Sequence, residues 1–329
     1  MADGRPPIHR IVTAQARNAL LRPGPDPTYA DGDDASWMGV DWPSLTRRMR
    51  VLGSEMNVVD TGGDGAAILW LHGLGGIWQN WLLNIPAFMD THRCIAPDLP
   101  GFGESEMPVD RISIKGYARA IDALCQQLDV DRVTIVGNSM GGFVGAEVAL
   151  EFGTRVERLV LVSAAGLSTE LQRPTPLLTA ARILAMGYQR HTYYDHLVVT
   201  RPRLRRAALQ TVMRYPERLS GPLVYEQIQG TGKRGFVGAL EALVTYSFRE
   251  QLARIEIPVL VVWGENDMLV PVSDAQRYVD LIGANARRVV FQDTGHTPML
   301  ERPSRFNGLL REFLAGDPTP ESEIAGVHA

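Results

Sequence analysis

The feature of this sequence that most constrains its fold is a series of apolar runs rich in β-branched residues, most of them followed by a segment with helical spacing. A strand covered by helices on both faces is continuously apolar, because neither set of side chains meets water. Strands that alternate with helices therefore predict a doubly wound, mostly parallel α/β sheet. The predicted strands cover residues 66–73, 92–99, 132–137, 156–165, 257–264 and 286–293, and the predicted helices cover residues 78–89, 113–128, 141–152, 273–282 and 302–314.

Two segments depart from this alternation. Residues 48–62 contain two short extended runs around a glycine, which predicts a β-hairpin at the start of the sheet. Residues 166–250 show helical patterns and no convincing strand, which predicts a helical cap over the carboxyl edge of the sheet, where open α/β sheets bind their ligands. The predicted organisation is an N-terminal extension and linker (1–45), a core domain in two parts (46–165 and 251–315) that flank the cap, and a flexible tail (316–329).

Composition excludes some classes of protein. The 329 residues are 45% hydrophobic, which is ample for a large core, and the net charge of -4 gives no electrostatic reason to expect a nucleic-acid partner. The two cysteines, Cys94 and Cys125, are too few for a disulfide framework and lie in apolar surroundings, so we expect small buried side chains.

The N-terminal residues bear on location. No apolar run reaches the roughly 18 residues of a membrane span, and the first residues lack the apolar stretch of a secretory signal. We therefore expect a cytoplasmic protein, and the sequence makes no prediction of its oligomeric state. Residues 8–22 show weak helical periodicity with several arginines, which favours a short helix on its own domain or on a partner subunit, or alternatively a weak membrane-surface contact.

The stretch Gly137-Asn138-Ser139-Met140-Gly141 fits the pattern G-x-S-x-G between a predicted strand and a predicted helix. In that setting the serine occupies a tight, strained turn, and the flanking glycines let neighbouring backbone come close. The serine side chain is then exposed at the end of the sheet, at a helix N-terminus that favours negative charge. Ser139 is therefore the predicted nucleophile.

A serine hydroxyl needs a base to remove its proton, and that base needs an acid to orient it. For this strand–turn–helix setting the expected order along the chain is serine, acid, histidine. Asp267 follows the predicted strand 257–264, and His296 lies in the loop after the strand 286–293. These two residues complete the predicted triad. The rival acids are Glu265, Asp274 and Asp293, of which Asp274 belongs instead to a helix start.

An acyl-transfer site also needs N–H donors for the developing oxyanion. The glycine-rich turn after the strand 66–73 places Gly73 beside the site and directs the Leu74 amide into it, and the Met140 amide follows the nucleophile directly. Leu74 and Met140 are the predicted donors. We interpret His72 as a residue that braces this turn, and a second base is the alternative.

The segments "LHGLGG", "PDLPGFGES", "GNSMGG", "GENDMLVP" and "GHTPMLERP" make residues 48–314 resemble the α/β-hydrolase-fold serine hydrolases, of the capped esterase or lipase type. The resemblance implies a structural role for Asp98, Gly101 and Gly103. Relatives that open epoxides or remove halides carry an aspartate at the nucleophile position, so Ser139 makes those reactions unexpected.

The segment "GNSMGG" also resembles the meta-cleavage-product hydrolases, which split carbon–carbon bonds. Those relatives carry an HGGGPG-type oxyanion loop and a tryptophan after the histidine, whereas this chain has "HGLGG" and Thr297. We therefore expect hydrolysis of a carboxylic ester through an acyl-enzyme. The alternatives are C–C hydrolysis, thioester or amide hydrolysis, and a ligand receptor or scaffold without turnover.

The pocket is expected to be apolar and to accept an acyl or aromatic group. Candidate substrate contacts are Gly73, Trp78, Asn138 and Phe143, with Met186, Tyr188, Tyr193 and Tyr194 from the cap. The basic run at residues 200–214 is either a solvated face or a docking surface for an anion, a membrane or a carrier protein. The mechanism requires no organic cofactor, and the sequence has no pattern of metal ligands.

Overall fold

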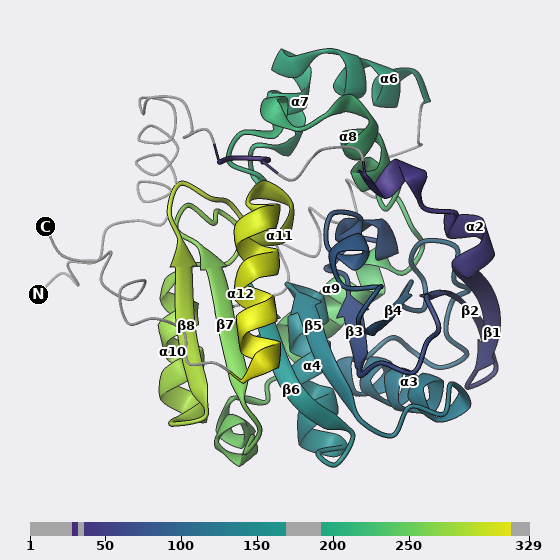
Figure 1. The fold of residues 1–329 in the computed structure, drawn as a ribbon, viewed down its shortest axis with the longest axis vertical. Coiled ribbons are helices and arrows are strands. Elements are labelled where there is room, and N and C mark those ends of the chain that lie inside the picture. Colours follow the sequence, from purple (N-terminus) through teal and green to yellow (C-terminus); the bar gives the residue numbers. More distant parts are fainter. Residues whose placement is uncertain (1–27, 32–35, 169–191, 317–329) are drawn as a thin grey trace, which may run out of the picture.

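Eight strands form one sheet in the computed structural model, which describes residues 28–31, 36–168 and 192–316 (Figure 1). The strand order is β1-β2-β4-β3-β5-β6-β7-β8, with antiparallel pairing of β1 with β2 and of β2 with β4 and parallel pairing elsewhere. The strands are β1 (Thr46–Val51), β2 (Ser54–Asp60), β3 (Ala67–Leu71), β4 (Arg93–Pro97), β5 (Val133–Asn138), β6 (Val156–Val162), β7 (Val259–Gly264) and β8 (Ala286–Phe291). The predicted doubly wound, mostly parallel sheet and its opening hairpin are confirmed.

Helices cover the sheet and extend beyond it (Figure 1). The α-helices are α2 (Trp42–Leu45), α3 (Ile114–Gln127), α4 (Met140–Glu151), α6 (Thr192–Thr200), α7 (Pro202–Leu209), α8 (Gly221–Ile228), α9 (Phe236–Thr245), α10 (Ser273–Ile282), α11 (Pro298–Glu301) and α12 (Pro303–Ala315). Short 3-10 helices are η1 (Ser36–Gly39), η2 (Trp78–Trp81), η3 (Ile85–Ala87), η5 (Pro216–Arg218) and η6 (Arg249–Arg254).

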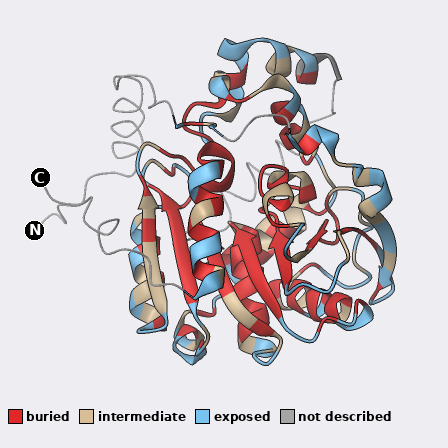
Figure 2. Ribbon diagram, in the orientation of Figure 1, coloured by how far each residue is buried: buried red, intermediate tan, exposed pale blue. Residues whose placement is uncertain are grey.

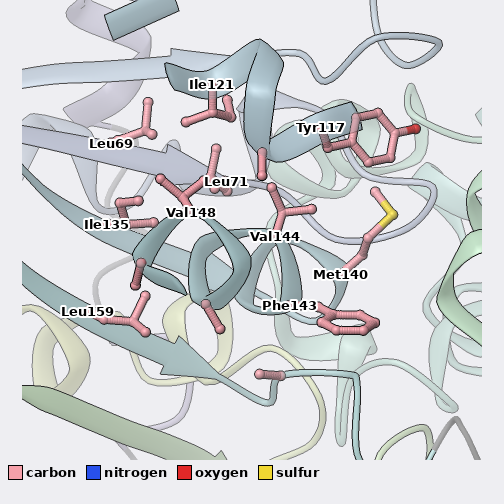
Figure 3. Packing of buried hydrophobic residues seen from close by; sticks show 14 of the residues in the cluster. Leu69, Leu71, Tyr117, Ile121, Ile135, Met140, Phe143, Val144, Val148 and Leu159 are labelled. Carbon is pink, nitrogen blue, oxygen red and sulfur yellow. The ribbon is translucent and has the colours of Figure 1, made fainter. Parts of the chain in front are cut away.

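The central strands β3, β5 and β7 are buried along their whole length, as continuously apolar strands require, whereas the edge strand β1 is partly exposed (Figure 2). Successive residues of β3 point to opposite faces, so Leu69 and Leu71 pack in one cluster with α3 and α4, while Ile68 and Trp70 pack in the other. Figure 3 shows the first cluster from close by. The second cluster includes apolar side chains of η2, α11 and α12.

The segment 78–89 differs from its prediction. It forms the two 3-10 helices η2 and η3 instead of one α-helix. Pro86 has no N–H to continue an α-helical ladder, and the backbone pairs residues three apart: Asn84 N bonds Trp81 O, and Ala87 N bonds Asn84 O, both at 2.9 Å. The pattern of apolar residues was right for burial and wrong for the helix type.

The described residues between β6 and β7 include helices α6 to α9 and no strand, and α6, α7 and α8 lie together at one end of the sheet, at the top of Figure 1. The core contacts this cap through backbone at two glycines, because Gly235 N donates to Gly101 O at 2.9 Å. A side-chain bond joins Asn80 Nδ2 to Gln227 Oε1 at 2.7 Å. The domain boundaries 166–250 stay a prediction.

Part of the predicted N-terminal linker is packed against the core. The exposed fractions of Tyr29 and Trp37 are 3% and 7%, and the ring of Trp42 lies 5.0 Å from that of Trp78. The predicted helix at residues 8–22 and most of the predicted tail lie outside the described residues. No helix within the described ranges is both long and apolar enough to cross a bilayer.

Candidate active site

Ser139 occupies a strained turn between β5 and α4. Its φ of 54° and ψ of −117° lie where a residue with a Cβ rarely goes, at a cost of about 1–3 kcal/mol. The surrounding backbone holds this conformation. Ser139 N donates to Val162 O at 2.9 Å, and Ser139 O accepts from Ala165 N at 3.0 Å and from Phe143 N at 3.2 Å. The turn predicted from G-x-S-x-G is therefore present.

The two outer glycines of the motif are required by close backbone approaches. A Cβ on Gly137 would lie 2.3 Å from Gly141 O, and a Cβ on Gly141 would lie 2.2 Å from Leu71 O at the end of β3. Both contacts are with backbone, which cannot rotate away as a side chain can. Glycine at these positions lets the serine turn lie directly against the neighbouring strand.

The turn exposes one side chain selectively. In the fully described stretch 133–149, Ser139 is half-buried and every other residue is buried. The side chain of Met140 belongs to the core cluster beside α4 (Figure 3), so that its amide is the group it can offer to a ligand. The fold thus presents a hydroxyl at the N-terminus of α4, in a stretch whose other residues are buried.

Asp267 and His296 are brought together from the ends of β7 and β8. His296 Nδ1 lies 2.7 Å from Asp267 Oδ2, and both side chains are buried. The second carboxylate oxygen, Oδ1, accepts from Leu269 N at 2.8 Å and from Val270 N at 2.9 Å. Since an ionised carboxylate only accepts, Nδ1 carries the proton and the Nε2 lone pair is left to act as a base.

The backbone of His296 is held on both sides. Its N–H donates to Val212 O of the cap at 2.8 Å, and its carbonyl accepts from Asn138 Nδ2 at 3.2 Å. The same amide of Asn138 donates to Val162 O at 3.1 Å. The residue before Ser139 therefore connects the serine turn to the histidine loop.

The rival acids have other partners. Glu265 Oε2 accepts from Asp293 N at 3.2 Å, and Asp293 Oδ1 accepts from Arg214 Nε at 3.1 Å. Asp274 lies in the first turn of α10 and accepts from the amide and hydroxyl of Ser168 at 2.9 and 2.6 Å. Among the described residues, Asp267 is the carboxylate that bonds the imidazole.

The glycine-rich turn after β3 lies against Ser139. A Cβ on Gly73 would be 3.1 Å from Ser139 Cβ. Within the described part of the chain, the amides of Leu74 and Met140 donate to no other group. The assignment of these two amides as oxyanion donors stays a prediction.

His72 braces this turn, as predicted. Its Nε2 accepts from Leu99 N at 2.9 Å, so its Nδ1 carries the proton and donates to Gly73 O at 2.8 Å. Complete burial lowers the pKa of His72 and keeps the ring neutral, although the nearby Asp98 charge opposes this shift. With both nitrogens occupied, His72 has none left to act as a second base.

Asp98 has the structural role that the resemblance implies. Its carboxylate accepts from Trp78 N and Asn57 Nδ2, both at 2.9 Å, and from Glu104 N at 3.0 Å. Gly103 has a φ of +52°, and a Cβ there would lie 2.0 Å from Asp98 Oδ2. These contacts hold the loop after β4 against β2 and η2.

The aromatic candidates for substrate contact belong to the core. The exposed fraction of Phe143 is 0%, and its ring stacks on Phe248 with centroids 4.4 Å apart. Trp78 packs in the cluster on the other face of the sheet. Both lie next to the site in the sequence, but neither placement supports a substrate contact. Asn138, the third candidate, uses its amide to hold the histidine loop.

The cap candidates are only partly placed. Met186 and Tyr188 lie outside the described residues. Tyr193 and Tyr194 belong to α6, and their side chains lie outside the described part of the chain.

In the basic run at residues 200–214, the exposed fraction of Arg205 is 5%, and its guanidinium donates to Val199 O and Leu219 O. Arg205 therefore stabilises the cap internally, which argues against its use in docking an anion.

Sequence reasoning missed Glu301 in the segment "PMLERP". Its exposed fraction is 0%, and its carboxylate accepts from the amides on either side of His296. The available signal was an acidic residue that directly follows an apolar pair within a short helix.

Within the described residues, no group of three or more histidine, cysteine, aspartate or glutamate side chains is arranged to bind a metal.

Comparisons with known proteins agree with this fold. A family model described as the alpha/beta hydrolase fold matches residues 66–303. A 2-hydroxy-6-oxo-6-phenylhexa-2,4-dienoate hydrolase from Comamonas testosteroni is 31% identical over 268 residues, which cover 77% of this chain and 88% of that protein.

Two solved structures extend the comparison. A meta-cleavage product hydrolase from Pseudomonas fluorescens, complexed with acetates, has a TM-score of 0.65 and 25% identity, covering 83% of this chain and 99% of that one. An enol-lactonase from Burkholderia xenovorans has a TM-score of 0.68 and 23% identity, covering 82% of this chain and 100% of that one, and it supports the fold alone.

Proposed function

The chain belongs to the α/β-hydrolase fold family, and we propose that it is a serine hydrolase that cleaves a carboxylic ester with an apolar acyl or aromatic group. The observation that carries this proposal is the junction at Asn138. Its amide joins the strained Ser139 turn to the carbonyl of His296, whose ring is already paired with Asp267 at 2.7 Å.

In the proposed first half-reaction, His296 Nε2 takes the proton of Ser139 Oγ as that oxygen attacks the ester carbonyl carbon. The amides of Leu74 and Met140 donate to the oxyanion. The tetrahedral intermediate collapses, the protonated imidazole gives its proton to the leaving alkoxide, and an alcohol departs. Asp267 keeps the tautomer and stabilises the imidazolium.

In the second half-reaction, His296 removes a proton from water, and the hydroxide attacks the acyl carbon of the ester formed with Ser139. The same two amides stabilise the second oxyanion. Collapse returns the proton to Ser139 Oγ and releases the carboxylic acid. Every proton transfer in this cycle uses the one imidazole, which is consistent with its fixed backbone and its single carboxylate partner.

C–C hydrolysis is the second candidate, because it is the type of reaction named for the dienoate hydrolase relative at 31% identity. Position 297 bears on the choice. The C–C hydrolases that the sequence resembles carry a tryptophan there, whereas here the Thr297 hydroxyl donates to Glu301 Oε1 at 3.1 Å inside the protein. This difference favours an ester substrate.

The experiment is a parallel assay of a short-chain p-nitrophenyl ester, the matching thioester and anilide, and 2-hydroxy-6-oxo-6-phenylhexa-2,4-dienoate. The proposal predicts the highest kcat/KM for an oxygen ester, and its loss in Ser139→Ala with the thermal unfolding midpoint nearly unchanged. Faster turnover of the dienoate than of any ester would select C–C hydrolysis. Ester turnover that survives Ser139→Ala would remove Ser139 as the nucleophile.

A further inference from the structure

Glu301 is a buried carboxylate shared by three parts of the chain. Its Oε2 accepts from Tyr29 Oη at 2.9 Å, from Arg214 N of the cap at 2.8 Å and from Gly295 N at 2.9 Å. Its Oε1 accepts from the amide and the hydroxyl of Thr297, both at 3.1 Å. The N-terminal segment, the cap and the histidine loop therefore meet at one side chain.

The arrangement encloses the predicted base. Gly295 and Thr297 flank His296, so the two oxygens of Glu301 hold the backbone on both sides of the imidazole. The packing there is tight, because a Cβ on Gly295 would lie 2.8 Å from Arg214 N and 3.0 Å from Val212 O. A shift of the Glu301 carboxylate would therefore move the histidine loop.

Tyr29 is fixed where it meets this carboxylate. Its hydroxyl donates to Glu301 and accepts from Tyr215 N at 2.9 Å, and the two tyrosine rings meet edge to face at 5.4 Å. The Arg302 guanidinium lies over the Tyr29 ring at 5.3 Å and donates to Thr28 Oγ1 at 2.7 Å. These contacts give the short segment 28–31 a defined place between the cap and α11.

The protonation of Tyr29 and Glu301 favours a stable hydrogen bond between them. Burial raises the pKa of the Tyr29 hydroxyl well above its usual range, and the Glu301 charge raises it further, so the hydroxyl keeps its proton and donates. Burial also raises the pKa of Glu301, which its neutral donors partly oppose. A buried carboxylate with neutral donors depends on each of them, so losing one leaves an oxygen poorly satisfied.

We propose that Tyr29 is a positioning residue for the base His296, acting through Glu301, so that the N-terminal segment 28–31 is part of the working active site. This inference rests on the proposed function. Without the Tyr29 hydroxyl, Oε2 keeps two of its three donors, and the bond from the Tyr215 amide to that hydroxyl is lost. Because small displacements of a catalytic group cost large factors in rate, the activation of Ser139 should fall.

The test measures the second-order rate at which a fluorophosphonate labels Ser139, which reports the activated serine without assuming a substrate. Tyr29→Phe keeps the ring and removes the hydroxyl, and it should lower this rate about tenfold, with kcat falling by the same factor and KM unchanged. Tyr225→Phe, at a 45% exposed ring on α8, should keep the wild-type rate. Trp37→Phe, which removes buried apolar packing in η1 and leaves the bonds to Glu301 in place, should lower the unfolding midpoint alone.

A second pair of variants tests the route through Glu301. In Glu301→Gln an NH₂ group replaces one carboxylate oxygen and must face the N–H and O–H donors that this oxygen accepted from. The labelling rate should therefore fall further than in Tyr29→Phe. Adding Tyr29→Phe to Glu301→Gln should cause no additional loss, because both changes act on one contact. If Glu301→Gln does not fold, Tyr29→Phe and its two controls still decide.

The outcomes separate this inference from the proposed function. Wild-type protein that fails to label at Ser139 would overturn the proposed function. Normal labelling of wild type together with a wild-type rate in Tyr29→Phe, or with an equal decrease in Trp37→Phe, would overturn the positioning role of Tyr29 and leave the serine hydrolase assignment intact.

Discussion

Replacing Asp267 with asparagine changes one atom of the candidate triad and should reverse the tautomer of His296. Oδ1 of Asp267 accepts from two backbone amides, Leu269 N and Val270 N, at 2.8 and 2.9 Å. An asparagine must place its oxygen there, because an NH₂ group would face two donors. Its NH₂ group then points at His296 Nδ1, which has to accept, and the ring proton moves to Nε2.

The expected decrease in kcat follows from this change of tautomer. With the proton on Nε2, the ring cannot take the proton of Ser139, and loss of the correct tautomer in a triad lowers kcat by about 10⁴-fold. At about 1.36 kcal/mol per tenfold change in rate, the barrier rises by about 5.4 kcal/mol. Since the two backbone bonds to the side-chain oxygen are kept, the fold and KM should change little.

The assay compares kcat and KM for a p-nitrophenyl ester at neutral pH in wild type, Asp267→Asn and Glu265→Gln. Glu265 is the rival acid two residues earlier, and its Oε2 accepts from Asp293 N instead of the imidazole. We expect Glu265→Gln to stay close to wild type. An Asp267→Asn variant that folds and retains kcat within about tenfold would refute the tautomer argument.

Two further predictions concern the framework of the site. Gly141→Ala places a Cβ 2.2 Å from Leu71 O, so the free energy of unfolding should fall by about 3 kcal/mol or more in urea denaturation, with loss of esterase activity. The control Gly308→Ala, at an open helical position, should be neutral or stabilising by up to about 1 kcal/mol, and equal effects of the two changes would contradict the account. Burial lowers the pKa of His72 in the folded state, so below about pH 6.5 the unfolded state binds a proton that the folded state does not bind. The free energy of unfolding should therefore have its full value above that pH and fall by up to about 1.4 kcal/mol per pH unit as the pH decreases. His72→Gln should remove this slope while His92→Gln, at a half-buried ring, should keep most of it, and an unchanged slope in His72→Gln would show that the buried ring is not its source.

The placement of the candidate triad could be predicted from the sequence because it depends on residue order and on strand ends. In a parallel sheet the carboxyl ends of the strands share one edge, so the residues that follow β5, β7 and β8 lie at the same edge of the sheet. Ser139, Asp267 and His296 each follow such a strand, and the two glycines beside Ser139 indicate close backbone.

The surroundings of the site could not be predicted in the same way. Phe143 and Trp78 are near Ser139 or its oxyanion loop in the sequence, but one ring points into the core on one face of the sheet and the other packs on the opposite face. Such directions depend on helix phase and on which loops become 3-10 turns. Nearness in sequence alone does not decide them.

Glu301 and Tyr29 illustrate a second limit. A glutamate is seldom fully buried, so the sequence favours a solvated side chain at position 301. Its burial depends on donors from distant segments, the amides of Arg214 and Gly295 and the Tyr29 hydroxyl. A proline- and aspartate-rich stretch likewise predicts a linker, and only the tertiary contacts of Tyr29 make part of it an anchored segment.

The most direct test of the central claim is peptide mapping by mass spectrometry after treatment with a fluorophosphonate, in wild type, Ser139→Ala and His296→Ala. The account predicts one adduct on the wild-type chain, located at Ser139, none in Ser139→Ala, and formation slowed by several orders of magnitude in His296→Ala. An adduct at another residue, or labelling of Ser139 at an unchanged rate without the imidazole, would contradict it.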